Sequence, residues 1–276
     1  MSSPYAPLAA AQASRTGADR RYGWVDRLIS DYDLNGPRIR LGLAWFVLAV
    51  AAALVGMVAV AVLFGLVAGA AGLQTAGAWR RAGRRPHQLV AGVGAVVMPV
   101  AALFGIGLAG VAALAFVVAA TVAALRDPRR RTPLVVSAGD TIRSGFFVGL
   151  AAAAAVLLAR TDAGALVVLV VLVSGYEVGD YVVGTGADNP AEGPIAGIAA
   201  VAVLTFAVAA FELPPFDGGS AWVFGLLVAA LAPLGRFVAG GLAPPGSRRV
   251  PALRRLDSWL IVAPVWAVLL WRYLGL

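Results

Sequence analysis

Long apolar segments begin at Leu41 and recur to the end of the chain, and they limit the possible folds more than any other feature. A helix that crosses a bilayer needs about 20 predominantly apolar residues. The blocks 41–79 and 88–125 are each about twice that length, so each predicts two helices, with a tight turn near Gly56 to Gly65 in the first block. Single helices are predicted over 145–159, 164–183, 194–211, 219–240 and 257–275. The pattern predicts an all-α, polytopic integral membrane protein with about nine transmembrane helices.

Composition agrees with this class. The chain is 61% hydrophobic and 13% charged, whereas soluble domains carry about 25% charged residues. It has no cysteine, which excludes disulfides and thiolate chemistry. The net charge is +8, and every basic residue is an arginine. The arginines form short runs between apolar segments, as cytoplasmic loops do, so we expect no nucleic-acid partner.

The arginines also indicate a topology. With a cytoplasmic N-terminus, nine helices place all but Arg160, Arg236 and Arg272 in cytoplasmic segments. Arg160 and Arg272 fall at the outer face, and Arg236 lies near the inner end of the eighth helix. The cytoplasmic segments are then 1–40, 80–87, 126–144, 184–193 and 241–256. This agreement with the positive-inside rule predicts a multi-pass protein of the cell's inner (plasma) membrane.

Three regions follow from the pattern. Residues 1–40 are predicted to be a cytoplasmic tail with a short amphipathic helix. That helix lies either on the membrane surface or against the protein's own loops. Residues 41–142 hold the N-terminal transmembrane helices, and residues 143–276 form a C-terminal transmembrane region. The apolar residues of the amphipathic helix recur at helical spacing: Trp24, Val25, Leu28, Ile29 and Tyr32.

A polar stretch at 176–193 places four carboxylates beside the apolar sixth helix. Glu177 and Asp180 are three residues apart and share a helix face. Two like charges on one face repel each other, so a metal, an arginine or a raised pKa is expected to compensate. Ionisable groups at membrane depth usually have a function. The alternative is that both carboxylates lie in water just outside the lipid.

The residues after this helix have a structural interpretation as well. Asn189 suits an N-cap, Pro190 the first helical position, and Glu192 the third position of a capping box. Asp188 adds negative charge near the positive end of the helix dipole. Glu192 is therefore either a cap or a binding residue. The stretch lacks the Gly-Lys-Ser/Thr of a phosphate-binding P-loop.

A second polar cluster covers 248–259 and contains four arginines. They either orient the protein and attract anionic headgroups or recognise phosphate on a lipid or nucleotide. Both roles are compatible. Asp257 or Ser258 can cap the last helix. The arginines are Arg248, Arg249, Arg254 and Arg255.

Several segments occur in a characteristic order: "GFFVGLAAAAAVLLAR", an apolar helix, "EVGDYVVG", a Glu-Gly pair opening a helix, "PLGRF" and "RRLDSWLIVAPV". Together they resemble the C-terminal half of the phosphatidate cytidylyltransferase family, the CDP-diacylglycerol synthases. The resemblance covers roughly 143–270. It implies a CTP-transferase-like membrane fold and, in most members, a homodimer. Such enzymes join CTP to phosphatidate with divalent metal and release pyrophosphate.

The resemblance suggests site residues. Glu177 stands at the Asp of the family pattern Asp-Thr-x-Ala-Tyr-x-x-Gly, which Tyr181 and Gly184 also fit. Arg255, Asp257 and Ser258 match the end of the final family signature. In an active enzyme, Glu177, Asp180 and Asp257 would be catalytic and hold Mg²⁺. The implied substrate-binding residues are Tyr181, Glu192, Arg248, Arg249, Arg254, Arg255 and Ser258.

The departures from the family fall on the chemistry. The segment before Glu192 is short and lacks the family's lysines, and a His-Gly-Gly turn is absent. The first Asp of the family's Asp-Arg-x-Asp is Arg254 here, and a Gly-Asp on the eighth helix is Gly235-Arg236. Nucleotidyl transfer depends on metals held by carboxylates, and a guanidinium repels Mg²⁺. Arg236 would instead pair with Glu177, Asp180 or Asp257.

Three functions are compatible with these residues. The first is a relative with weakened or lost catalysis that binds phosphatidate, another anionic lipid or CTP, or regulates another membrane enzyme as a complex or homodimer. The second is an active CTP:phosphatidate cytidylyltransferase that makes CDP-diacylglycerol with Mg²⁺. The third is a small-solute transporter gated by the acidic loop. The absence of a visible inverted repeat argues against the third.

Overall fold

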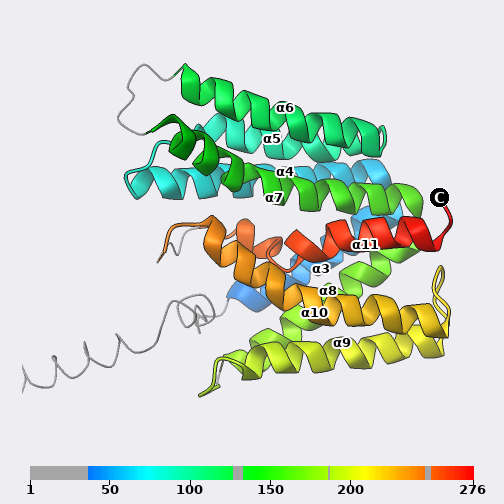
Figure 1. The fold of residues 1–276 in the computed structure, drawn as a ribbon. Helices are drawn as coiled ribbons and strands as arrows, with labels where there is room; N and C mark the ends of the chain where they lie inside the picture. Colours follow the sequence, from blue (N-terminus) through cyan, green and yellow to red (C-terminus); the bar gives the residue numbers. More distant parts are fainter. Residues whose placement is uncertain (1–36, 127–132, 186, 246–249) are drawn as a thin grey trace, which may run out of the picture.

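The computed structural model describes residues 37–126, 133–185, 187–245 and 250–276. These residues form nine α-helices, one short 3₁₀ helix and no strand (Figure 1). The predicted all-α class is confirmed, and each helix lies on one of the predicted apolar segments. The helices are α3 (Pro37–Val55), α4 (Met57–Arg81), α5 (Gln88–Ala102), α6 (Ile106–Leu125), α7 (Leu134–Thr161), α8 (Ala163–Gly184), α9 (Glu192–Ala210), α10 (Gly218–Leu242), η1 (Leu253–Arg255) and α11 (Trp259–Tyr273).

Six of the described helices are long enough and apolar enough to cross a bilayer: α4, α6, α7, α8, α9 and α10. The other three apolar stretches, Leu41–Val55, Gln88–Ala102 and Trp259–Tyr273, have 10–17 residues and fall short of that length. The structure therefore supports a membrane-embedded protein with six candidate spans, and the expected count of about nine is not confirmed. The predicted N-terminal tail lies outside the described residues up to 36, and residues 37–40 already belong to α3.

A single glycine reverses the chain between α3 and α4. Gly56 has a φ of 126°, a left-handed region that glycine enters without steric cost. The reversal brings Trp45 of α3 against Phe64 of α4, with ring centroids 5.2 Å apart. Phe64 also meets Trp259 at 5.1 Å, so this turn brings α3 and α4 into the core beside α11.

The C-terminal part of the predicted basic loop over 126–144 is helical. Helix α7 begins at Leu134, so residues 134–144 are helical and that part of the prediction is wrong. Pro133 is the N-cap residue of the helix, and the hydroxyls of Thr141 and Ser144 donate to the carbonyls four residues earlier. Polar residues that look like loop can therefore continue a helix. Residue 142 consequently lies inside α7 rather than between two regions.

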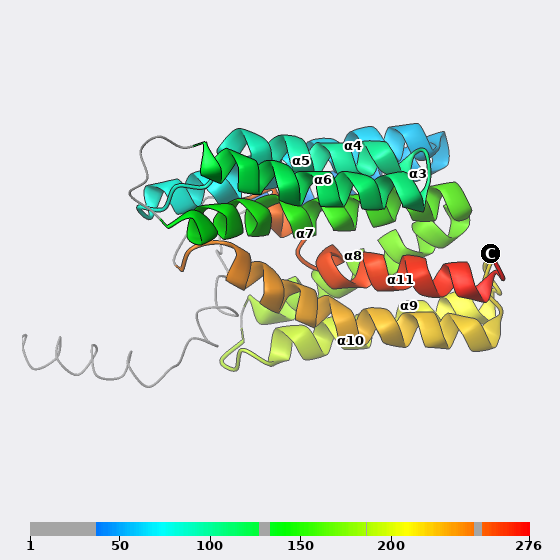
Figure 2. The ribbon, with the colours of Figure 1, turned by 45° about the horizontal axis from the view of Figure 1, so that its top comes forward.

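The helices form two layers (Figures 1 and 2). Helices α4 to α7 make one layer, in which α7 packs against all three of the others. Helices α8 to α11 make the second layer, and α11 packs on α7 across the interface. The C-terminal ends of α4, α6, α8 and α10 all lie at one end of the bundle, on the left in Figure 1. We call it the basic end, because Arg84, Arg85 and Arg126 belong to it.

The segment 250–258 runs from the basic end into the bundle before α11 starts (Figure 1). Its apolar side chains Val250, Leu253 and Leu256 are buried. The Ala252 N–H donates to Oε1 of Gln74 on α4, 3.1 Å away. Buried backbone N–H and C=O groups outside regular helices need hydrogen-bond partners within the protein. This segment therefore brings polar residues of the chain's last part among the helices.

Candidate functional site

An ion pair joins α8 and α10 near the basic end. Nη1 of Arg236 contacts Oδ2 of Asp180. The Asp180 side chain is 5% exposed and that of Arg236 is 27% exposed. Asp180 lies in a candidate membrane span, where an ionised carboxylate is costly without a compensating charge. The guanidinium supplies that charge.

Gly235 lets α10 contact segment 250–258 directly. A Cβ on Gly235 would lie 2.5 Å from the carbonyl oxygen of Asp257 and 3.3 Å from that of Ser258. Only glycine fits so close to another backbone. The neighbouring Arg236 is thereby held beside Asp257, and the positive charge of Arg236 acts on the Asp257 carboxylate.

Glu177 lies one helical turn before Asp180 on α8. Its Oε1 is buried and has no hydrogen-bond partner among the described residues. The charges of Asp257, Arg255 and Arg236 act on this carboxylate. The structure thus brings Glu177 and Asp257, 80 positions apart in the numbering, into one electrostatic neighbourhood.

Asp257 lies two residues before the start of α11, whose N-cap residue Ser258 makes no side-chain capping bond, so the capping expected of Asp257 or Ser258 is not seen. Oδ1 of Asp257 accepts hydrogen bonds from the N–H of Ser258 at 2.7 Å and from the Ser258 hydroxyl at 3.3 Å. Asp257 keeps some accessible surface, yet burial of the carboxyl raises its pKa. The positive charge of Arg236 and the bonds from Ser258 oppose that rise only in part.

Two further arginines complete the group. The charge of Arg254 acts on Asp257, and Nη1 of Arg255 lies 3.6 Å from the position a Cβ on Gly42 of α3 would take. Arg248 and Arg249 lie outside the described residues. Three carboxylates therefore face three guanidiniums. We call them the ion cluster: Glu177, Asp180, Arg236, Arg254, Arg255 and Asp257.

Among the predicted site residues that the structure describes, Ser258 bonds to Asp257, and Tyr181 and Glu192 also lie outside the six-residue ion cluster. Tyr181 is half-buried on α8, and Glu192 is exposed at the start of α9. Oδ1 of Asn189 accepts from the Ala191 N–H at 3.0 Å, as an N-cap does, but α9 starts at Glu192 rather than at Pro190. A complete capping box occurs instead at the start of α10, where Asp217 and Ser220 bond reciprocally. Its Asp-x-x-Ser spacing was visible in the sequence.

The carboxylates do not fit a metal ion held by all three. In the part of the chain that the structure describes, no group of three or more His, Asp or Glu side chains could hold one. Asp180 already accepts from Arg236, and cations surround Glu177 and Asp257. A divalent cation needs several oxygen ligands, and this arrangement of carboxylates and guanidiniums does not offer them.

A second cluster of charges escaped the sequence interpretation. Asp140 of α7 pairs with Arg143 at 2.8 Å and with Arg84 at 3.5 Å. The Arg143 guanidinium lies 3.6 Å from the ring centre of Trp79 on α4. The Trp79 Nε1–H donates to the carbonyl of Leu242, 2.7 Å away at the end of α10. We call these residues the tryptophan cluster: Trp79, Arg84, Asp140 and Arg143.

Comparisons with known proteins find no similar one. No family model matches this chain, no curated protein matches it, and no solved structure matches it. The resemblance to the CDP-diacylglycerol synthases therefore depends on the quoted sequence segments alone.

Proposed function

We propose that this chain is a divergent membrane protein of the CDP-diacylglycerol synthase type that has lost nucleotidyl transfer. In this proposal it binds phosphatidate or another anionic lipid at the inner face of the cell membrane and modulates a partner membrane enzyme. The observation that supports it is the Arg236–Asp180 ion pair. A guanidinium is bound to a carboxylate that would otherwise be available to a metal.

The reason is electrostatic. Phosphoryl and nucleotidyl transfer are accelerated by metal ions that neutralise charge on phosphate oxygens. Arg236 neutralises Asp180, while Arg254 and Arg255 act on Asp257 and Glu177. A divalent metal ion at the same place would be repelled by these arginines. The ion cluster is therefore suited to structure and to anion binding rather than to catalysis.

Lipid binding would use the charge at the basic end. Arginine forks bind phosphate in a bidentate manner, and basic residues near a membrane surface gain about 1 kcal/mol each from anionic lipids. Arg254 and Arg255 lie within segment 250–258 and are half-buried. A phosphate monoester is the headgroup chemistry that two neighbouring guanidiniums would recognise.

An activity assay tests the loss of catalysis. The purified full chain is supplied with CTP, Mg²⁺ and phosphatidate in mixed micelles, and CDP-diacylglycerol is measured. We expect no product above that of a protein-free reaction. Phosphatidate should still bind, and Arg254→Gln with Arg255→Gln should weaken it, whereas Arg272→Gln at the opposite end should not. Steady formation of CDP-diacylglycerol would overturn the proposal.

An active cytidylyltransferase is the second candidate, and one observation favours it. Oε1 of Glu177 is buried without a hydrogen-bond partner in the described part of the chain, beside Asp257. In such an arrangement two carboxylates could share a ligand. The same assay decides between the candidates. If CDP-diacylglycerol forms, Glu177→Gln and Asp257→Asn should abolish it, and full activity in both variants would exclude the ion cluster as the catalytic site.

A further inference from the structure

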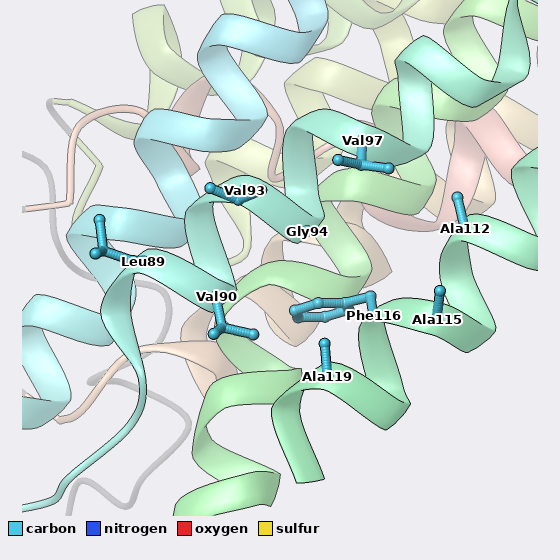
Figure 3. A pocket seen from close by; sticks show the side chains of 9 residues that line it. All are labelled: Leu89, Val90, Val93, Gly94, Val97, Ala112, Ala115, Phe116 and Ala119. Atoms are coloured by element: carbon cyan, nitrogen blue, oxygen red, sulfur yellow. The ribbon is translucent and has the colours of Figure 1, made fainter. Parts of the chain in front are cut away.

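An apolar groove lies between α5 and α6 (Figure 3). These two helices belong to the layer of α4 to α7, whereas the Arg236–Asp180 pair lies on α8 and α10 of the other layer (Figure 1). Its volume is about 350 Å³, within the range of ligand pockets. The ring of Phe116 forms its floor, packs directly on Gly94, and stacks on Phe146 of α7. The lining residues are Leu89, Val90, Val93, Gly94, Val97, Ala112, Ala115, Phe116 and Ala119.

The groove opens on the apolar outer surface of the bundle. Leu89 is 76% exposed, and Val93 and Val97 are also exposed along the same rim. Ala115 and Ala119 are exposed on the opposite wall, which belongs to the candidate span α6. An open apolar groove on a membrane-spanning helix faces hydrocarbon rather than water. Its chemistry therefore fits a hydrocarbon chain.

One end of the groove is cationic. Leu89 lies one residue after the start of α5, and Ala119 lies in the last third of α6, so both mark the end of the groove near the basic end (Figure 3). Arg81 closes α4 and Arg126 follows α6, and both are exposed at that end. Anionic headgroups are attracted to arginines near the membrane surface.

We propose that this groove binds one acyl chain of an anionic phospholipid whose headgroup lies at Arg81 and Arg126. The arginines at the mouth distinguish a lipid from a second transmembrane helix, because an apolar helix offers no complementary charge there. This inference stands apart from the proposed function, since neither Arg254 nor Arg255 lines the groove.

Native mass spectrometry of the full chain in detergent tests the proposal. Dioleoyl phosphatidylglycerol and dioleoyl phosphatidylcholine are titrated separately, and the dissociation constant of the first bound lipid is compared. We expect tighter binding of phosphatidylglycerol. Ala115→Phe with Ala119→Phe fills the groove and should weaken both lipids by about tenfold, the effect of losing about two buried methylene groups.

The matched control places the same side chains elsewhere on α6. Leu114 and Val118 are exposed and do not line the groove, so Leu114→Phe with Val118→Phe should bind lipid like the wild type. Arg81→Gln with Arg126→Gln should weaken phosphatidylglycerol by at least about fivefold and leave phosphatidylcholine unchanged.

Three results would overturn the proposal. One is unchanged lipid binding by the filled groove. Another is equal affinity of the wild type for the two lipids. The third is that the Ala115→Phe, Ala119→Phe variant changes from dimer to monomer and still binds lipid. That result would assign the groove to a helix of a second copy.

Discussion

The ion cluster and the tryptophan cluster both place arginine on a buried aspartate, yet they are built differently. Asp180 and Asp140 have equally buried side chains, each 5% exposed. Asp140 has two arginines, one of them three residues away on its own helix. Asp180 pairs with Arg236 of another helix, in a group that holds as many carboxylates as guanidiniums.

The difference concerns how the positive charge is shared among the carboxylates. At the tryptophan cluster, Arg84 is 45% exposed and backs up Arg143, so water and a second cation both compensate Asp140. In the ion cluster, the Arg236 charge that pairs with Asp180 also acts on Glu177 and Asp257. Each guanidinium in the ion cluster should therefore matter more to stability, and the following experiments test this contrast.

Removing Arg236 should have the largest effect. Arg236→Ala takes away the charge that compensates Asp180, and breaking a buried pair costs about 3–5 kcal/mol. Arg84→Ala should cost less than about 1 kcal/mol, because Arg143 stays on Asp140. The free energy of unfolding in detergent micelles measures both. Equal losses of unfolding free energy in Arg236→Ala and Arg84→Ala would remove the contrast. Adding Asp180→Ala to Arg236→Ala should recover part of the stability that Arg236→Ala loses.

The backbone contact at Gly235 should come next. Gly235→Ala places a Cβ 2.5 Å from the Asp257 carbonyl, so α10 or segment 250–258 must shift, at a cost of about 1–3 kcal/mol. At Gly241, also on α10, a Cβ would meet no neighbouring group of the described chain within 4 Å. Gly241→Ala should be neutral or slightly stabilising in the same unfolding measurement. A neutral Gly235→Ala would show that this contact does not position Arg236.

Asp257 should show a smaller, pH-dependent effect. Its pKa is raised, so between its ordinary and its raised pKa the folded state binds more protons than the unfolded state. Stability then falls as pH rises through that window. Asp257→Asn removes this loss, so its stability relative to the wild type should increase from about pH 4 to about pH 8. The free energies of unfolding of variant and wild type at both pH values measure this difference. A decrease of the relative stability with rising pH would contradict the burial of the Asp257 carboxyl.

Asp217 provides the control for that pH dependence. Hydrogen bonds from Ser220 lower the pKa of this exposed carboxyl. Its stabilising contribution is complete above the ordinary carboxyl pKa and is lost only as pH falls through the lowered value. The effect of Asp217→Asn on stability should therefore change much less between the two pH values than the effect of Asp257→Asn.

Arg143 should have the smallest effect. Arg143→Gln removes a stacked cation over Trp79 and one of the two ion pairs of Asp140. Such contacts contribute about 1 kcal/mol when partly exposed. Arg143→Lys keeps the charge and loses the planar stack, so its stability should lie between that of Arg143→Gln and that of the wild type. A loss as large as that of Arg236→Ala would make the two clusters equivalent.

Apolar length predicted the helices well, because every described helix carries its hydrophobic stretch in the sequence. The start of α7 was missed, since Asp140, Thr141 and Arg143 look like loop residues. Their bonds within the helix and to the turn before α5 appear only in the fold. The i, i+3 spacing of Asp140 and Arg143 was the available signal.

The residues of the candidate site could be selected from the sequence, and Arg236 was expected to pair with one of three carboxylates, but the sequence did not specify which one. Glu177, Asp180, Arg236 and Asp257 could be selected as ionisable residues near helix ends. Their pairing depends on how α8 packs near α10 and on the approach of Gly235 to Asp257, which no local pattern specifies. The α5–α6 groove likewise depends on the packing of Phe116 on Gly94 rather than on composition.

The central claim is that arginine, not a divalent cation, compensates the carboxylates of the ion cluster. An experimental structure of the full chain in lipid, determined with saturating Mg²⁺, tests it most directly. We predict the Arg236 guanidinium on Asp180 and no cation among Glu177, Asp180 and Asp257. An ordered cation held by those carboxylates, with Arg236 turned away from Asp180, would contradict the claim.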